Sequence, residues 1–299
     1  MTSGQTMANT GDRLETMPVG PHVALVRWLL RGWAAAVLAF TYAPIVLLVL
    51  FSFEDSRNIG FPITGFSLRW YEGLPANTAL VRAVATSITI ALVVAVVATA
   101  VGTLAAFPLV RAGIRRPNAA RVLFTMPIML PGILIGVGLL VFLAGILKVP
   151  LSLLTVIAGH VVLTMPFVVL IVSARLQSFD RRLEWAAADL GANPVRTLRY
   201  VVLPLIAPAI LAGALISITL SIDEFVVTFF TVGPQLTLPI YIYTQIKFGV
   251  TPEVNAVATL VLVGTALVLG LGTLLAMLTR RAIRLRRRRV AVNRSEANA

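Results

Sequence analysis

The sequence predicts an all-α membrane protein whose chain crosses the bilayer several times. Of its 299 residues, 58% are hydrophobic and only 12% are charged, about half the charged fraction of an average soluble domain. The mean hydropathy is +0.93, and apolar runs of about 20 residues, the length of a spanning helix, recur along the whole chain. Cysteine is absent, which excludes disulfides, iron–sulfur clusters and thiolate metal sites.

Six transmembrane helices account for the apolar runs. Basic residues are concentrated in the two tails and in the second and fourth connections, which hold 20 of the 25 Lys and Arg. Cytoplasmic segments of membrane proteins are enriched in these residues, so both termini are expected in the cytoplasm. The net charge of +13 therefore indicates topology and not nucleic-acid binding. The expected spans are 32–51, 83–110, 122–147, 151–172, 205–230 and 256–278.

The spans divide the chain into four parts. A cytoplasmic N-terminal tail, 1–31, is followed by the first span with an external loop, 32–82. A five-helix transmembrane domain, 83–278, contains a cytoplasmic loop at 173–204, and a basic cytoplasmic tail covers 279–299. The N-terminal tail is polar and lacks a small-residue cleavage site, so no secretory signal is expected. The arginine-rich C-terminal tail is expected to contact the anionic inner leaflet of the bilayer.

The first span and its loop carry aromatic residues at the expected membrane surface. Trp28 and Trp33 are suited to anchoring a helix at the level of the lipid headgroups. The external loop, 52–81, is long for a simple turn and contains the amphipathic sequence FSLRWYEGL. Two interpretations fit this loop, contact with an external partner or an ordered connection without a partner.

The third span is interrupted by Pro127 and Pro131, and Gly132, Gly136 and Gly138 follow. Each proline removes a backbone donor, and broken backbone in a bilayer is tolerated where it faces protein or a water-filled cavity. The glycines alone fit ordinary close packing between helices. The two prolines favour a bend, and we expect this span to curve around a pathway.

Three ionisable residues lie within later spans. His160 falls near the middle of the fourth span, and Asp223 and Glu224 fall in the outer part of the fifth. Such groups are costly in lipid unless they are paired or hydrated, and they often mark a functional pathway. His160 fits either a pathway role or a neutral hydrogen bond to a neighbouring helix. The two carboxylates fit either contact with a cationic solute or an ion pair with Lys247.

A polar island, 183–208, separates the fourth and fifth spans. It carries Glu184, Asp189, Arg196 and Arg199 in a chain that is otherwise poor in charge. A connection that only joined two spans could be much shorter. The island has helix signals of its own, so we expect it to dock against a partner in the cytoplasm.

Capping residues predict two short helices in this island. Gly191 fits the C-terminal cap of a helix over 183–190. Asn193 fits an N-cap, with Pro194 at the first helical position. The second helix, 195–202, is expected to end at Pro204, which also opens the fifth span. The two helices would form a compact knob suited to a groove on a partner.

Catalytic and nucleotide-binding motifs are missing. The chain has two His and no Cys, and it contains neither H-E-x-x-H nor G-x-S-x-G. Its only lysines, Lys148 and Lys247, do not follow glycine, which excludes the G-x-x-x-x-G-K-[ST] loop. We therefore expect no enzymatic activity, no bound metal and no cofactor. If the chain moves a solute uphill, the energy comes from an ion gradient or from another subunit.

The polar island resembles the cytoplasmic loop of binding-protein-dependent ABC importer permeases. In that family an E-A-A-x-x-x-G sequence precedes a Leu-Pro by about a dozen residues. Trp185 stands where the family usually has Glu, and Glu184 lies one place earlier. The positions that carry the resemblance or would contact the ATPase are Glu184, Trp185, Ala186, Ala187, Asp189, Gly191, Arg196, Leu203 and Pro204.

Further segments resemble the C-type permease subunits of spermidine/putrescine importers. They read SIDEFVVTFFTVGP, LPIYIY and TPEVNA, and GHVVLTMPFV in the fourth span is similar as well. The resemblance covers about residues 80–278. It implies the type I ABC importer permease fold with six transmembrane helices in the cell inner membrane.

The resemblance also implies partners and a mechanism. The permease would work with a dimer of ABC ATPase subunits that bind the ATP, with a second permease subunit, and with an extracytoplasmic solute-binding protein. The docking loop would transmit ATPase closure to the spans. Candidate pathway residues are Asp223, Glu224, His160, Pro127 and Pro131. The alternatives are the same machinery with another solute, such as an amino-acid derivative or an organic anion, and a proton-coupled secondary transporter.

Overall fold

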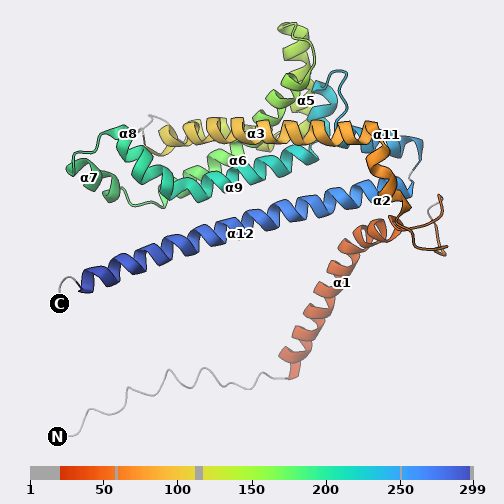
Figure 1. Cartoon of the computed structure of the whole chain (residues 1–299), viewed down its shortest axis with the longest axis horizontal. Coiled ribbons are helices and arrows are strands. Elements are labelled where there is room, and N and C mark those ends of the chain that lie inside the picture. The colour runs from red at the N-terminus through yellow and green to blue at the C-terminus, as the bar shows by residue number, and fades with distance from the viewer. Residues whose placement is uncertain (1–20, 58–59, 112–116, 250, 297–299) are drawn as a thin grey trace. The chain divides into compact units, whose positions relative to one another are not determined.

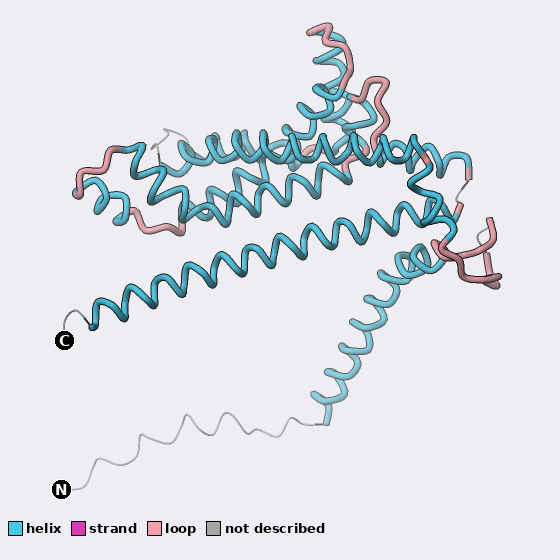
Figure 2. Tube along the Cα trace, viewed as in Figure 1, coloured by secondary structure: helices cyan, strands magenta, loops and turns pink. Residues whose placement is uncertain are grey.

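The computed structural model describes residues 21–57, 60–111, 117–249 and 251–296. The ordered elements of this part of the chain are helices (Figure 2). One isolated β-bridge joins Glu54 to Phe66. The chain forms two compact units that divide after Phe51. The first 20 residues of the N-terminal tail, the last three of the C-terminal tail, and Arg115 and Arg116 of the second connection lie outside the described residues.

The first unit contains one long helix, α1 (Pro21–Phe51) (Figure 1). Its segment Leu25–Phe51 is long and apolar enough to cross a membrane. Trp28 and Trp33 are exposed on this helix, and the Arg31 guanidinium lies 5.6 Å from the centre of the Trp28 ring. Aromatic and basic side chains at one end of an apolar helix suit the headgroup region.

The second unit holds the remaining helices. It contributes four more helices long and apolar enough to span, and α4 and α5 together form a fifth candidate that is bent by 96°. The elements in chain order are α2 (Arg69–Gly73), a 3₁₀ turn (Leu74–Ala76), α3 (Thr78–Arg111), α4 (Pro117–Met129), α5 (Gly132–Leu140), a π-helical turn (Val141–Ile146), α6 (Leu153–Gln177), α7 (Arg182–Asp189), α8 (Pro194–Thr197), a second π-helical turn (Leu198–Val202), α9 (Leu203–Asp223), α10 (Val226–Thr231), α11 (Leu238–Phe248) and α12 (Pro252–Glu296).

Helices α3, α6 and α9 lie side by side and form the core of the second unit (Figure 1). Small residues allow their backbones to approach closely. A Cβ atom added to Gly102 of α3 would lie 2.8 Å from Cβ of Val168 in α6, and one added to Gly213 of α9 would lie 3.2 Å from Cγ1 of the same valine. Val168 is fully buried and thus fills the space that two glycines leave on either side of it.

The expected bend in the third span is confirmed. Pro131 is extended, with φ −55° and ψ 135°, and it separates α4 from α5. Of the glycines that follow, Gly136 is at a close contact, since a Cβ on it would lie 2.8 Å from the ring of Phe230 in α10. The span therefore breaks at Pro131 and has a close contact at Gly136, whereas Pro127, also expected to interrupt it, lies inside α4.

The fifth span differs from the continuous helix expected over 205–230. Helix α9 ends at Asp223, Glu224 is extended with φ −74° and ψ 105°, and α10 begins at Val226. The carboxylate of Glu224 accepts the backbone N–H of Val227 at 2.8 Å. A side chain that caps a new helix in this way competes with continuation of the old one. The span therefore breaks at Glu224.

Polar contacts join the helix ends at one end of the second unit, where α2, α11 and the start of α12 meet α3 (Figure 1). Asn77 accepts the N–H of Leu80 and so caps α3. Its amide also donates to Tyr241 of α11 at 2.8 Å and to Glu253 of α12 at 3.1 Å. Helices α7 and α8 lie at the opposite end of α3 (Figure 1).

Candidate functional site

The polar island forms a protruding loop whose first helix, α7, has a well-defined end. Gly191 has φ +81°, a conformation that glycine adopts without the penalty that Cβ imposes. The N–H of Gly191 donates to the carbonyl of Ala188, and the N–H of Ala192 donates to that of Ala187. This pair of bonds is the Schellman motif. The expected cap at Gly191 is confirmed.

The second helix of the island begins as expected but does not end at Pro204. The side chain of Asn193 accepts the N–H of Arg196 at 2.8 Å, so Asn193 is the N-cap. The helical path from Pro194 then continues to Asp223 as one spanning segment. A proline crowds the carbonyl four residues before it, and that residue, Tyr200, lies in the π-helical turn, where the helix is wider. The turn therefore lets the helix pass Pro204, and the expected second short helix is wrong.

The island presents apolar side chains to the surroundings. The exposed fraction is 61% for Trp185, 90% for Leu190, 71% for Val195 and 69% for Tyr200. Ala186, Asp189 and Arg196 are exposed among them, whereas Ala187 is half-buried. Clustered exposed apolar groups in a polar loop typically mark an interaction surface.

Glu184 forms an ion pair with Arg111 at the end of α3. The distance from Oε1 of Glu184 to Nη2 of Arg111 is 2.7 Å, and the two side chains are 24% and 15% exposed. The Arg111 guanidinium also lies 5.4 Å from the centre of the Phe179 ring. The carboxylate therefore holds α7 against a span to which the loop is not directly connected in sequence.

Leu203 and Pro204 follow Tyr200 by three and four residues on the same helical segment. With Arg199 they line an open groove of about 480 Å³ on the surface of α9. Nearby, Nε of Arg175 at the end of α6 donates to the carbonyl of Leu205 at 3.0 Å. This bond joins the two spans on either side of the island.

Three of the expected pathway residues line one small cavity inside the second unit. Pro127 of α4, His160 of α6 and Glu224 after α9 surround a volume of about 190 Å³. The cavity lies beside the break between α4 and α5 and the break between α9 and α10. Both interruptions of the helical backbone therefore lie at a cavity with a carboxylate, the setting in which broken backbone is tolerated at membrane depth.

His160 is held by two hydroxyl groups. Its Nδ1 lies 2.8 Å from Oγ of Ser221, and its Nε2 lies 2.7 Å from Oγ1 of Thr228. The Thr228 hydroxyl donates to the carbonyl of Glu224, so it accepts from Nε2–H, and Nδ1 accepts from Ser221. This arrangement fits a neutral imidazole and the hydrogen-bonded interpretation of His160.

Asp223 and Pro131 do not line this cavity. Asp223 is exposed at the end of α9, and Pro131 lies at the bend between α4 and α5. Within the described part of the chain neither Asp223 nor Glu224 forms an ion pair with Lys247. The same part of the chain shows no group of three or more His, Asp or Glu side chains suited to a metal ion.

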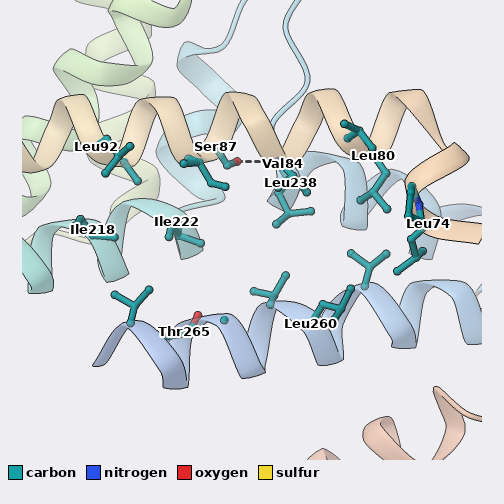
Figure 3. A pocket seen from close by; sticks show the side chains of 18 residues that line it. Leu74, Leu80, Val84, Ser87, Leu92, Ile218, Ile222, Leu238, Leu260 and Thr265 are labelled. Atoms are coloured by element: carbon teal, nitrogen blue, oxygen red, sulfur yellow. Dashed lines mark hydrogen bonds between the residues drawn. The ribbon is translucent and has the colours of Figure 1, made fainter. Parts of the chain in front are cut away.

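A further cavity of the second unit is apolar. It has a volume of about 630 Å³ and lies between α3, α9 and α12 (Figure 3). The side chains that point into it are almost all aliphatic, and the Ser87 hydroxyl at its wall accepts the backbone N–H of Leu238. It offers no charged group to a polar solute. The labelled residues are Leu74, Leu80, Val84, Ser87, Leu92, Ile218, Ile222, Leu238, Leu260 and Thr265.

Several residues of these sites were not identified from sequence. The sequence indicates Arg111 only as one of the basic residues that predict orientation, and not as the partner of Glu184. It contains no signal that Ser221 and Thr228 are hydrogen-bond partners of His160. Glu54, in the loop before α2, is 1% exposed, and its Oε1 accepts from the Thr64 hydroxyl at 2.6 Å. No local pattern marks these pairs, because the partners are 10 to 73 residues apart in sequence.

Comparison with known proteins gives a consistent result. Residues 98–289 match the model of the family described as "Binding-protein-dependent transport system inner membrane component". The spermidine/putrescine transport system permease protein PotC of Escherichia coli K12 is 41% identical over 239 residues, which cover 79% of this chain and 89% of PotC. The putrescine transport system permease protein PotI of the same strain is 39% identical over 241 residues, 77% of this chain and 85% of PotI.

Solved structures resemble the chain more distantly in sequence. A chain of a bacterial ABC transporter for the acidic polysaccharide alginate superposes with a TM-score of 0.68 at 15% identity, over 86% of this chain and 95% of that one. A chain of the MetNI methionine ABC transporter gives 0.59 at 21% identity, over 69% and 98%. Likeness at these identities establishes a shared fold and leaves the solute open.

Proposed function

This chain belongs to the family of binding-protein-dependent transport system inner membrane components, and we propose that it is the permease subunit of an ATP-driven importer of polyamines. The observation that carries the solute class is its 41% and 39% identity to two permeases of spermidine and putrescine transport. The carboxylate of Glu224 at the interior cavity supports a cationic solute.

The energy for transport would come from partner subunits. The chain lacks the phosphate-binding loop that would hold ATP, so an ABC ATPase dimer would bind and hydrolyse it, and the permease itself would be no enzyme and need no cofactor. The ATPase would dock on the exposed side chains of the polar island, Trp185, Leu190, Val195 and Tyr200. Two permease subunits and an external solute-binding protein would complete the importer.

Orientation follows from the charge distribution. The polar island and both termini would lie in the cytoplasm, and α2, α11 and the loop before α2 would lie outside. The island and this outer group lie at opposite ends of α3 (Figure 1). The importer requires this separation, because the ATPase and the solute-binding protein would dock on opposite sides of the membrane.

Transport would proceed by a switch between two states. ATPase closure would move α7 and the start of the long helix Pro194–Asp223, and the spans would turn from inward-facing to outward-facing. Such a switch is biased by ligands that bind one state better than the other. Glu224 would receive the cationic amine, and His160 would hold α6 to α9 and α10 beside it.

Reconstitution with the ATPase, the partner permease and the solute-binding protein tests the solute class. ATP hydrolysis would be measured with the binding protein loaded with spermidine, putrescine, a neutral amino acid or an organic anion. Stimulation by the two polyamines supports the proposal. Stimulation by an anion or a neutral solute, with none by either polyamine, would contradict polyamines as the solute and assign the stimulating class instead.

A further inference from the structure

One acidic residue of the polar island, Glu184, is already paired within the chain. Oε1 of Glu184 and Nη2 of Arg111, the two atoms that meet at 2.7 Å, are both shielded from solvent. The neighbouring Trp185 is 61% exposed. Residues adjacent on a helix point about 100° apart, so one faces α3 and the other faces outward. An ATPase that approaches this surface meets the indole before the carboxylate.

Arg111 is held in place from a second side. Its guanidinium lies 5.4 Å from the ring centre of Phe179, which precedes α7 and is 8% exposed. Phe179 belongs to the buried cluster that contains Ala106 of α3, Leu176 of α6 and Ile206 of α9. A guanidinium between an aromatic ring and a carboxylate has few alternative positions. The ion pair is therefore built on the common core of the three central spans.

We propose that Arg111 and Glu184 form an internal bracket that fixes α7 to the cytoplasmic end of α3, so that the ATPase is contacted through Trp185 and not through the Glu184 carboxylate. This inference rests on the proposed function for the identity of the partner. The loop is joined to α6 and α9 by the chain itself, and the bracket adds a direct link from α7 to α3 beside the packing of α3 on α6 and α9. Arg111 and Glu184 are positioning residues, because they act on the ATPase contact through α7.

Charge variants of the bracket separate positioning from direct contact. Glu184→Gln and Arg111→Gln should each lower the uptake per ATP hydrolysed by about fivefold, the effect of losing a coupled pair. The dissociation constant for the ATPase should change by less than about twofold. The exchange variant, Arg111→Glu with Glu184→Arg, should restore at least half of the lost coupling. Arg121→Gln, an equal charge change at an exposed position of α4, is the matched control and should leave coupling unchanged.

The absence of cysteine allows the contact itself to be observed. Trp185→Cys in nanodiscs should react with a maleimide in the permease alone and become protected when the ATPase is added. Phe66→Cys, in the external loop and 69% exposed in the native chain, should react equally in both states. Trp185→Ala should raise the dissociation constant for the ATPase by about tenfold, as for an exposed aromatic anchor at an interface.

Three outcomes would overturn the proposal. The first is a tenfold weaker ATPase complex in Glu184→Gln that the exchange variant does not restore. The second is a cysteine at position 185 that stays reactive although the complex forms. The third is unchanged coupling in both single variants. Thermal unfolding of the chain without partners tests the bracket separately. The single variants should lower the midpoint and the exchange should recover it. Failure of the native chain to bind any ATPase, with these midpoints as expected, would refute the proposed function and leave the bracket standing.

Discussion

Nδ1 of His160 lies 2.8 Å from Oγ of Ser221, and this hydrogen bond joins the first half of α6 to the last turn of α9. The other ring nitrogen bonds Thr228 on α10, so the imidazole links three helices at the point where the fifth span breaks. Both ring nitrogens have partners within the protein. His160 is therefore expected to stabilise the cavity wall and not to relay protons.

Replacement of His160 by Ala should destabilise the protein. It leaves the buried hydroxyls of Ser221 and Thr228 without this partner, and the free energy of unfolding should fall by about 2 kcal/mol. The loss of stability is measured by heating the protein and recording how much of the monodisperse peak remains in size-exclusion chromatography. His160→Gln, which keeps one donor and one acceptor, should lose less. Native stability in His160→Ala together with abolished uptake would indicate a direct role in transport instead.

Glu224→Gln should lower polyamine uptake without unfolding the span. The Gln side chain can still accept the N–H of Val227, so the cap of α10 is kept while the charge is removed. Loss of one charged contact to an amine should reduce uptake at low solute concentration by about tenfold or more. Asp223→Asn is the matched control, because Asp223 is exposed and does not line the cavity. Uptake that depends on Asp223 and not on Glu224 would contradict this placement.

Gly191→Pro should uncouple ATP hydrolysis from uptake. Proline holds φ near −65°, whereas Gly191 has φ +81°, so the end of α7 and its two closing hydrogen bonds would be lost. Gly191→Ala should have a milder effect, since a Cβ there meets no atom within 4 Å and the left-handed conformation costs about 1–2 kcal/mol. Gly138→Ala is the control, because Gly138 has equal space in a regular helix. Undiminished coupling in Gly191→Pro would count against the docking role of the loop.

Glu54 should make the loop before α2 sensitive to acid. The Thr64 hydroxyl that donates to its carboxylate, aided by backbone N–H groups and opposed by burial, holds the pKa of Glu54 below its usual value of 4.5. The stabilisation is complete above pH 4.5 and is lost as the pH falls through the lower folded pKa. The difference in thermal midpoint between the native chain and Glu54→Gln should therefore shrink with acid. A difference that grows with acid would reverse the sign expected here.

The sequence predicts the elements that depend on local signals. The length of the apolar runs predicts the spans. Gly191 and Asn193 predict the helix caps of the polar island, and Pro131 predicts the bend. Each of these acts on backbone within a few residues, so no tertiary information was needed. The family resemblance supplied the fold and the class of partner.

The remaining features depend on contacts between distant segments. The continuation of the helix through Pro204 relies on a π-helical turn, and the break at Glu224 relies on a side chain that caps the next helix. The pairing of Arg111 with Glu184 joins residues 73 positions apart. Such pairs arise only when the helices pack, and a single sequence contains no pattern that assigns them.

Energy coupling is the central claim, and uptake of labelled spermidine into proteoliposomes tests it most directly. Vesicles would contain this chain with its partner permease and ATPase, with the loaded binding protein outside and ATP inside, or this chain alone under an imposed pH gradient. Uptake should require ATP and the ATPase and should be absent for the chain alone. Accumulation by the chain alone, driven by the pH gradient, would contradict the assignment to an ATP-driven importer.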